Sequence, residues 1–269
     1  MRWHWASASV PGSSHRRTGQ PLQDVHVCRQ LPGGVWAAVL SDGAGSARHG
    51  GAGAALTCRH LMQAVRRHGG LVAQAGVALP DGGLPSDDLC RQWLAQLRSR
   101  LVGVASRRGL AARDFACTLV MAISTGTQTL VLHVGDGGAV VRCADIGRWQ
   151  VLSWPQHGEY ASTTAFVTDP AAVLRISRLD AAIDGLVLFS DGLERQVLDW
   201  AAHTAFSPFF TAMAAPLLAA APAIDVARAD DAFAGRLPGL CRQLVQYLGS
   251  PAVTARTDDD TTLVVAVRT

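Results

Sequence analysis

The sequence predicts an α+β domain built in layers. Three observations support this prediction: two early amphipathic helices, a long central run of short strands separated by tight turns, and a final apolar strand after further helices. The hydrophobic fraction is 49% and the charged fraction 17%, which is enough apolar material for a large core. No flexible linker and no repeat of fixed period divides the chain. We therefore expect residues 1–269 to form a single domain.

The first part of the chain predicts two strands followed by two helices. Residues 24–31 alternate apolar and polar side chains, and residues 35–40 form a continuous apolar run. A glycine-rich stretch then leads into a helix over 55–69, which Gly69 and Gly70 are expected to end. After a loop rich in Gly, Pro and Asp, Ser86 is the expected N-cap of a second helix over 87–109.

The middle of the chain is a series of predicted strands, and helices follow it. The strand candidates cover 115–124, 127–135, 137–144, 148–154, 163–168, 172–179 and 185–190. From Leu193 to about Leu248 the pattern becomes helical and rich in alanine, most clearly over 237–249. The chain closes with a predicted strand over 261–269, which follows three consecutive aspartates.

Composition excludes several classes of function. The net charge of +3 comes without a clustered basic face, so we expect no nucleic-acid partner. Six scattered cysteines form no CxxC pair, which argues against a zinc ribbon and favours reduced, buried thiols in the cytoplasm. The chain start has no continuous apolar segment, and the apolar stretch at 212–224 is short and interrupted by Pro216 and Pro222. A soluble protein without membrane contact is expected.

Aspartates stand at the ends of many of the predicted strands. The apolar runs before "SDG" at 41–43 and at 190–192 end in Asp42 and Asp191. Asp24 opens a strand, Asp136 lies in the turn "VGDGG", and residues 258–260 precede the last strand. Strand ends of a layered sheet structure can converge, and a partly buried carboxylate needs a hydrogen-bond partner or a cation.

Two interpretations of these aspartates stay open on the residues alone. Asp-Gly is a common turn dipeptide, and for any one of these positions a turn is sufficient explanation. Several aspartates beside glycines, without a single lysine in the chain, also suit a Mg²⁺ or Mn²⁺ site with oxygen ligands.

Six segments in order resemble the metal-dependent PP2C (PPM) Ser/Thr protein phosphatases of bacteria. They are "SHRRTGQPLQD", "LSDGAGSA", "FACTLVMAI", "HVGDGGAVV", "LFSDGLER" and "DDDTTLVVAV". The resemblance implies a four-layer αββα sandwich of two antiparallel sheets flanked by helices. It also implies a metal-dependent phosphatase that hydrolyses phosphoserine and phosphothreonine by direct attack of an activated water.

The resemblance further implies roles for individual residues. Asp42 would bridge two Mn²⁺ or Mg²⁺ ions, the Gly43 carbonyl would bind one, and Asp191 and Asp259 would hold the other. Asp24 would bind a metal or its water, and Asp136 would serve the third ion of some bacterial members. Phosphate binding would fall to His15, Arg16 or Arg17, unless these form only a solvated basic loop.

Departures from the family pattern leave parts of the mechanism open. Ala44 stands where the best-known members carry the histidine that protonates the leaving group, so His49 or water would have to replace it. Gln23 replaces a glutamate before Asp24, which removes one charge from the metal site. An alternative function is therefore a pseudophosphatase or regulatory module that keeps the metal site with little turnover. A further alternative is a phosphatase for one signalling protein.

The partner expected in the main hypothesis is a phosphorylated protein, either a Ser/Thr kinase or its target. The enzyme itself is expected to be a monomer. The segment 196–249 is expected to include surface that faces the substrate.

Overall fold

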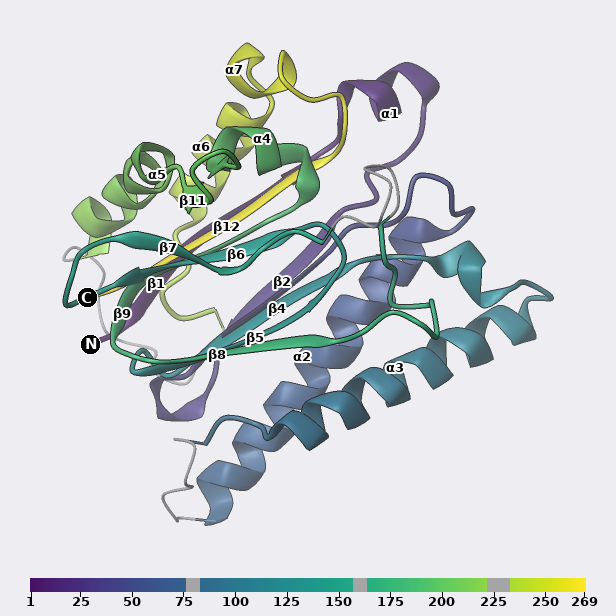
Figure 1. Cartoon of the computed structure of the whole chain (residues 1–269), viewed down its shortest axis with the longest axis horizontal. Coiled ribbons are helices and arrows are strands. Elements are labelled where there is room, and N and C mark those ends of the chain that lie inside the picture. Colours follow the sequence, from purple (N-terminus) through teal and green to yellow (C-terminus); the bar gives the residue numbers. More distant parts are fainter. Residues whose placement is uncertain (76–82, 157–163, 222–232) are drawn as a thin grey trace.

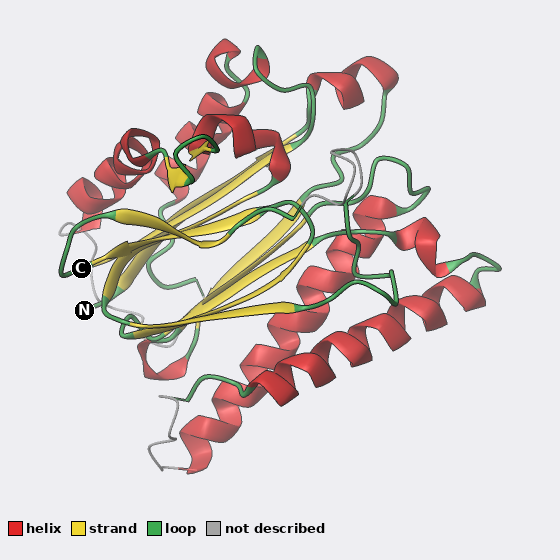
Figure 2. Ribbon diagram, viewed as in Figure 1, coloured by secondary structure: helices red, strands yellow, loops and turns green. Residues whose placement is uncertain are grey.

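The computed structural model describes residues 1–75, 83–156, 164–221 and 233–269, and all statements below refer to these. Two five-stranded antiparallel sheets stack face to face, and helices cover both outer faces (Figures 1 and 2). One sheet has the strand order β1-β12-β9-β6-β7, and the other has the order β2-β3-β4-β5-β8. The αββα sandwich implied by the resemblance is confirmed.

Strands and helices occur largely in separate runs along the chain, as expected for a layered α+β protein. The strands are β1 (Trp3–Val10), β2 (Val25–Gln30), β3 (Trp36–Ser41), β4 (Leu119–Ser124), β5 (Gln128–Val134), β6 (Gly138–Cys143), β7 (Trp149–Ser153), β8 (Arg175–Asp180), β9 (Ile183–Phe189), β10 (Leu198–Asp199), β11 (Thr204–Ala205) and β12 (Thr261–Arg268). The α-helices are α1 (Ser13–Thr18), α2 (Gly50–Ala75), α3 (Asp87–Arg107), α4 (Glu194–Val197), α5 (Ser207–Ala220), α6 (Pro238–Leu248) and α7 (Pro251–Thr254). Short 3₁₀ turns are η1 (Pro32–Gly34), η2 (Ala112–Phe115) and η3 (Asp191–Leu193).

Three apolar layers hold the sandwich together. The helices α2 and α3 pack on the β2–β8 sheet, and α5 and α6 pack on the β1–β7 sheet. Between the sheets lies a third layer that includes Trp3, Trp5 and Trp36, with the rings of Trp3 and Trp36 stacked at 5.7 Å.

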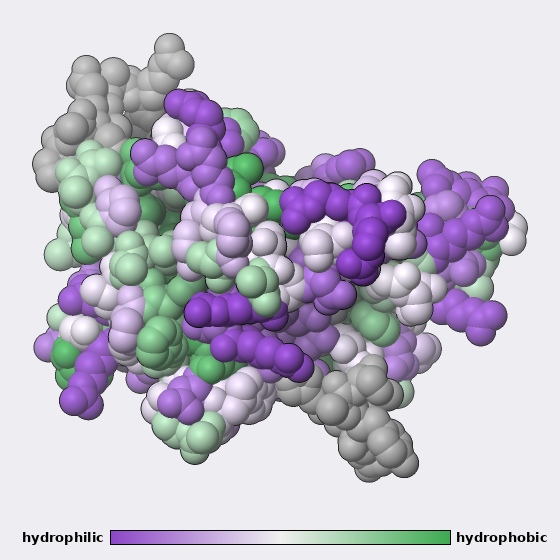
Figure 3. Space-filling view, turned by 90° about the horizontal axis from the view of Figure 1, so that it is seen from above, coloured by the Kyte–Doolittle hydropathy of each residue, from purple (hydrophilic) through white to green (hydrophobic). Residues whose placement is uncertain are grey.

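The outer face over α5 and α6 stays partly apolar. Seen from above, green apolar residues gather over these helices, and Leu218 and Val245 are among the exposed ones (Figure 3). None of the helices in the described part of the chain combines the length and apolarity needed to cross a membrane. The six cysteines are free and buried, as predicted.

Four expectations from the sequence differ from the structure. The strand β1 was not predicted, although it pairs with β12 along its whole length. Helix α2 begins at Gly50 and continues through Gly69 and Gly70, because its packing against α3 and the sheet outweighs the helix propensity of two glycines. The stretch predicted as a strand over 163–168 forms a loop over its described part, 164–168. The helical region after Leu193 contains the hairpin β10–β11, and its part at 222–232 lies outside the described residues.

The predicted start of α3 is confirmed. The Ser86 hydroxyl accepts a hydrogen bond from the backbone N–H of Leu89 at 3.3 Å, and Asp87 and Asp88 occupy the first turn. Acidic side chains there interact favourably with the helix dipole.

Candidate metal centre

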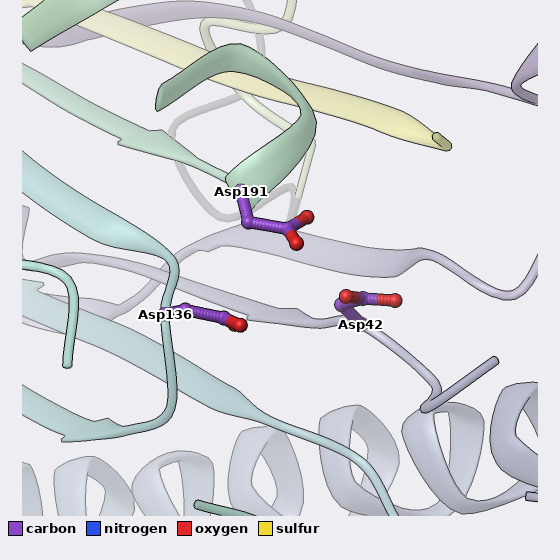
Figure 4. A group of neighbouring side chains, drawn as sticks. All are labelled: Asp42, Asp136 and Asp191. Carbon is purple, nitrogen blue, oxygen red and sulfur yellow. The ribbon is translucent and has the colours of Figure 1, made fainter. Parts of the chain in front are cut away.

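Three aspartates from three separate parts of the chain meet at one end of the sandwich. Asp42 directly follows β3, Asp136 lies in the turn between β5 and β6, and Asp191 opens η3 after β9. One carboxylate oxygen from each lies within 4.8 Å of the other two, and the side chains point toward one another (Figure 4). The convergence expected from the sequence is therefore present for these three residues.

The glycine of each Ser-Asp-Gly segment allows a close approach of two backbones. A Cβ atom on Gly43 would lie 2.3 Å from the carbonyl carbon of Gly50 at the start of α2. A Cβ atom on Gly192 would lie 2.2 Å from the carbonyl oxygen of Asp260, just before β12. Only glycine fits in either place, so both segments need Asp-Gly to place their carboxylates beside a neighbouring element.

Asp24 lies beside this group and is more deeply buried. Its side chain is 2% exposed, and its Oδ2 accepts hydrogen bonds from the hydroxyls of Ser190 and Thr262, both at 2.8 Å. Its Oδ1 is buried without a hydrogen bond from any described donor, and the Asp42 carboxyl is its neighbour. Sequence reasoning did not identify Ser190 and Thr262 as partners of Asp24. Their positions in the Ser-Asp-Gly and Asp-x-x-Thr segments were the available signal.

The last two aspartates of the acidic run have different environments. Asp259 is exposed; its Oδ1 accepts a hydrogen bond from the Asp260 N–H, and its charge acts on Asp42 and Asp191. Asp260 is 1% exposed and accepts hydrogen bonds from the N–H groups of Gly12 and Gln23 and from His15 Nδ1. The carboxylate of Asp260 therefore ties the segment before β2 to the start of β12, a role that sequence reasoning missed.

Burial raises the pKa of four carboxyl groups at the site. Loss of hydration raises the pKa of Asp42 well above its usual range, and the neighbouring charges of Asp24, Asp191 and Asp259 raise it further. The pKa of Asp191 is raised well above its usual range in the same way, first by burial and then by Asp136 and Asp259. Burial raises the pKa of Asp24 to about 6, although the hydrogen bonds from Thr262 and Ser190 oppose the shift. Burial also raises the pKa of the Asp259 carboxyl.

These carboxylates suit a divalent cation. Among the described residues, no arginine or histidine forms an ion pair with Asp24, Asp42 or Asp191. The Oδ1 atoms of Asp24 and Asp191 are buried without a described hydrogen-bond donor. Converging anions of this kind, with raised pKa values and unsatisfied oxygens, are stabilised by a hard cation with oxygen ligands.

The other predicted site residues lie in varied surroundings. When its side-chain amide nitrogen faces the segment after β3, Gln23 donates a hydrogen bond to the Gly43 carbonyl at 2.8 Å. The His49 ring stacks on Phe115, with 5.3 Å between ring centroids. His15 is 7% exposed and bound to Asp260, whereas Arg16 and Arg17 are exposed on α1. Of the three basic candidates for phosphate binding, only the two arginines therefore have side chains that face solvent.

Asp136 has a partner that the sequence did not indicate. The hydroxyl of Thr164 donates a hydrogen bond to Asp136 Oδ2. The loop that carries Thr164 is held by Arg98 of α3, whose guanidinium donates to the carbonyls of Val167, Asp169 and Ala172. The loop predicted as a strand thus packs between helix α3 and the Asp136 turn.

Comparisons with known proteins agree with this arrangement. A family profile described as Protein phosphatase 2C matches residues 11–229. Serine/threonine-protein phosphatase 3 of Escherichia coli (strain K12) is 35% identical over 277 residues, which cover 99% of each chain. The crystal structure of the serine/threonine phosphatase Stp1 from Staphylococcus aureus superposes with a TM-score of 0.62 at 16% identity, covering 100% of this chain and 96% of that one. The catalytic domain of the serine threonine protein phosphatase PstP, in complex with 2 manganese ions, superposes with a TM-score of 0.55 at 16% identity, covering 98% and 97%.

Proposed function

Because this chain belongs to the protein phosphatase 2C family and is a phosphoprotein phosphatase, we propose that it hydrolyses phosphoserine and phosphothreonine at a binuclear site for Mn²⁺ or Mg²⁺. The observation that carries the proposal is the convergence of Asp42, Asp136 and Asp191 within 4.8 Å. The complex of PstP with 2 manganese ions supports a divalent metal requirement.

The carboxylates divide the work of holding the cations. Asp42, whose carboxylate lies among the other acidic groups, would be shared by the two ions, and Asp191 and Asp259 would hold one of them. The Gly43 carbonyl, which the Gln23 amide reaches at 2.8 Å, would be a further oxygen ligand. Asp24 would hold a metal or its water through Oδ1, the oxygen that has no described hydrogen-bond donor. Asp136, with Asp191, would hold a third ion.

When bound, two divalent cations supply positive charge that lowers the pKa of a water molecule and stabilises the phosphoryl oxygens. The aspartates stay ionised in that state, because each cation offsets the cost of burying their charge. Arg16 and Arg17 extend into solvent and are available to meet the substrate phosphate. The nucleophilic group is a water, so no covalent phosphoenzyme forms.

The leaving serine or threonine oxygen takes its proton from water in this proposal. Ala44 offers no proton, and the His49 ring stacks on Phe115. If water is the proton donor, the rate of hydrolysis should depend less on pH than it would with a histidine as general acid, because no side-chain pKa then governs this proton transfer.

The substrate of the enzyme is a phosphorylated protein, either a Ser/Thr kinase or its target. The enzyme works as a monomer in the cytoplasm. Because the carboxylates of the site are retained, a catalytic function is favoured over that of a pseudophosphatase or regulatory module.

Turnover of phosphopeptides by the purified chain tests the proposal. Hydrolysis of phosphoserine and phosphothreonine peptides is measured with Mn²⁺, with Mg²⁺ and with EDTA, for the wild type and for Asp191→Ala. The exposed Asp180→Asn serves as the control for loss of one carboxylate. The proposal expects metal-dependent turnover that Asp191→Ala abolishes and Asp180→Asn keeps. Mn²⁺ binding without turnover on any phosphopeptide would overturn it in favour of a pseudophosphatase.

A further inference from the structure

A continuous path of hydrogen bonds runs from His26 to the carboxylate of Asp24. The Nδ1 atom of His26 lies 2.8 Å from the Ser9 hydroxyl, which lies 2.6 Å from the hydroxyl of Thr262. The Thr262 hydroxyl in turn lies 2.8 Å from Asp24 Oδ2. The path crosses between the two sheets, because His26 and Asp24 belong to β2 and its start, whereas Ser9 and Thr262 are paired on β1 and β12.

Counting protons fixes the direction of every bond in this path. An ionised carboxylate only accepts, so Thr262 uses its single hydroxyl proton on Asp24. The bond between Ser9 and Thr262 therefore needs the proton of Ser9, and Ser9 has no proton left for His26. The ring nitrogen Nδ1 of His26 must then carry hydrogen and donate to Ser9. If Ser9 donated to His26 instead, no proton would remain between the oxygens of Ser9 and Thr262. If Thr262 donated to Ser9, its oxygen would face the Asp24 carboxylate without a proton between them.

The second hydroxyl at Asp24 is committed in the same way. Ser190 donates to Asp24 Oδ2 and accepts from the backbone N–H of Thr262 at 2.9 Å. Both donors therefore hold the same oxygen of Asp24 and leave Oδ1, on a carboxyl group that neighbours Asp42, without a described donor. The orientation of the carboxylate depends on Thr262 keeping its proton on Oδ2.

We propose that Ser9 and His26 are positioning residues, which fix the hydroxyl of Thr262 as a donor and thereby orient Asp24 to bind the divalent cation. The proposal rests on the proposed function, in which Asp24 serves the metal. Ser9 and His26 touch neither the cation nor the substrate. They act through Thr262, as residues behind metal ligands commonly do.

Two measurements test this assignment independently of turnover. The first is the tautomer of His26 in the metal-free protein at pH 8, read from long-range ¹H–¹⁵N correlations of the imidazole rings. The His26 signals are assigned by their absence in His26→Gln. The second is calorimetric titration of Mn²⁺ into Ser9→Ala, Ser9→Thr and Ser7→Ala. Ser7 is buried two residues earlier on the same strand and makes a matched control.

The proposal expects hydrogen on Nδ1 of His26 in the wild type. It expects Mn²⁺ to bind Ser9→Ala about tenfold more weakly, because removing a partner behind a metal ligand typically costs 10- to 100-fold in affinity. Ser9→Thr should restore wild-type affinity, since it keeps the hydroxyl, and Ser7→Ala should not change it.

Hydrogen on Nε2 alone would overturn the proposal, as would unchanged Mn²⁺ affinity in Ser9→Ala. If Ser9→Ala does not fold, the tautomer of the wild type decides. If the wild type binds no Mn²⁺, the proposed function fails, and the tautomer alone then supports or overturns the fixed direction of the path.

Discussion

Replacing Asp42 by asparagine should stabilise the metal-free protein and remove its stabilisation by Mn²⁺. The carboxylate oxygens lie within 4.8 Å of one another, and two unit charges at that distance repel each other by about 3.5 kcal/mol at an effective dielectric constant of 20. Proton uptake relieves part of this repulsion, since the pKa of Asp42 is raised well above its usual range. We therefore expect a gain of about 1–3 kcal/mol at pH 8, or roughly 2–12 °C in Tm.

The same substitution should have the opposite effect when the metal is present. A ligand at 100 times its Kd stabilises a protein by about 2.7 kcal/mol, and the wild type should gain this amount for each Mn²⁺ site. Asp42→Asn lacks one carboxylate of the proposed metal site and should gain much less.

Differential scanning calorimetry with and without Mn²⁺ separates the two effects, with the exposed Asp180→Asn as control. The reasoning is refuted if metal-free Asp42→Asn is less stable than the wild type and still gains the full Mn²⁺ stabilisation.

Three further predictions concern the surroundings of the site. Gly43→Ala should cost about 1–3 kcal/mol in calorimetry, because its Cβ would meet the backbone of Gly50, whereas Gly45→Ala points into open space and should cost little; equal effects would contradict the packing argument. The free energy of unfolding of the metal-free protein should fall by roughly 3 kcal/mol as pH rises from about 4 to 6, because Asp24, with its pKa raised to about 6, keeps a proton in the folded state that the unfolded state releases. Asp24→Asn should flatten this pH dependence of stability, and an unchanged dependence would contradict the prediction. Arg98→Ala should speed hydrogen exchange at the amides of Val167 and Ala172, since their loop loses three hydrogen bonds; unaltered exchange would show that Arg98 does not hold the loop.

Much of the fold was predictable from local patterns, and the differences have physical causes. The strands of the centre and the N-cap at Ser86 followed from periodicity and capping chemistry. The strand β1 was hidden because small residues weaken its alternation, and its partner β12 lies at the other end of the chain. The glycine pair at 69–70 predicted a helix end, but tertiary packing of a long helix outweighed the local preference.

The part of the site formed by aspartates at the ends of apolar strands was predictable from the sequence. Asp42, Asp136 and Asp191 each follow an apolar run, and their convergence needed only a layered sheet structure. The contacts of Asp260 with His15 and the N–H groups of Gly12 and Gln23 could not be predicted, since they join segments more than 200 residues apart. The path from His26 through Ser9 depends on the register of two sheets, which no local pattern encodes.

Anomalous scattering from a crystal soaked in Mn²⁺ tests the central claim most directly. We expect two peaks about 3.5–4 Å apart, with Asp42 between them and Asp191 and Asp259 beside one of them. A third peak would lie beside Asp136. A map without peaks at these carboxylates, or with Mn²⁺ bound only elsewhere, would rule out the proposed binuclear site.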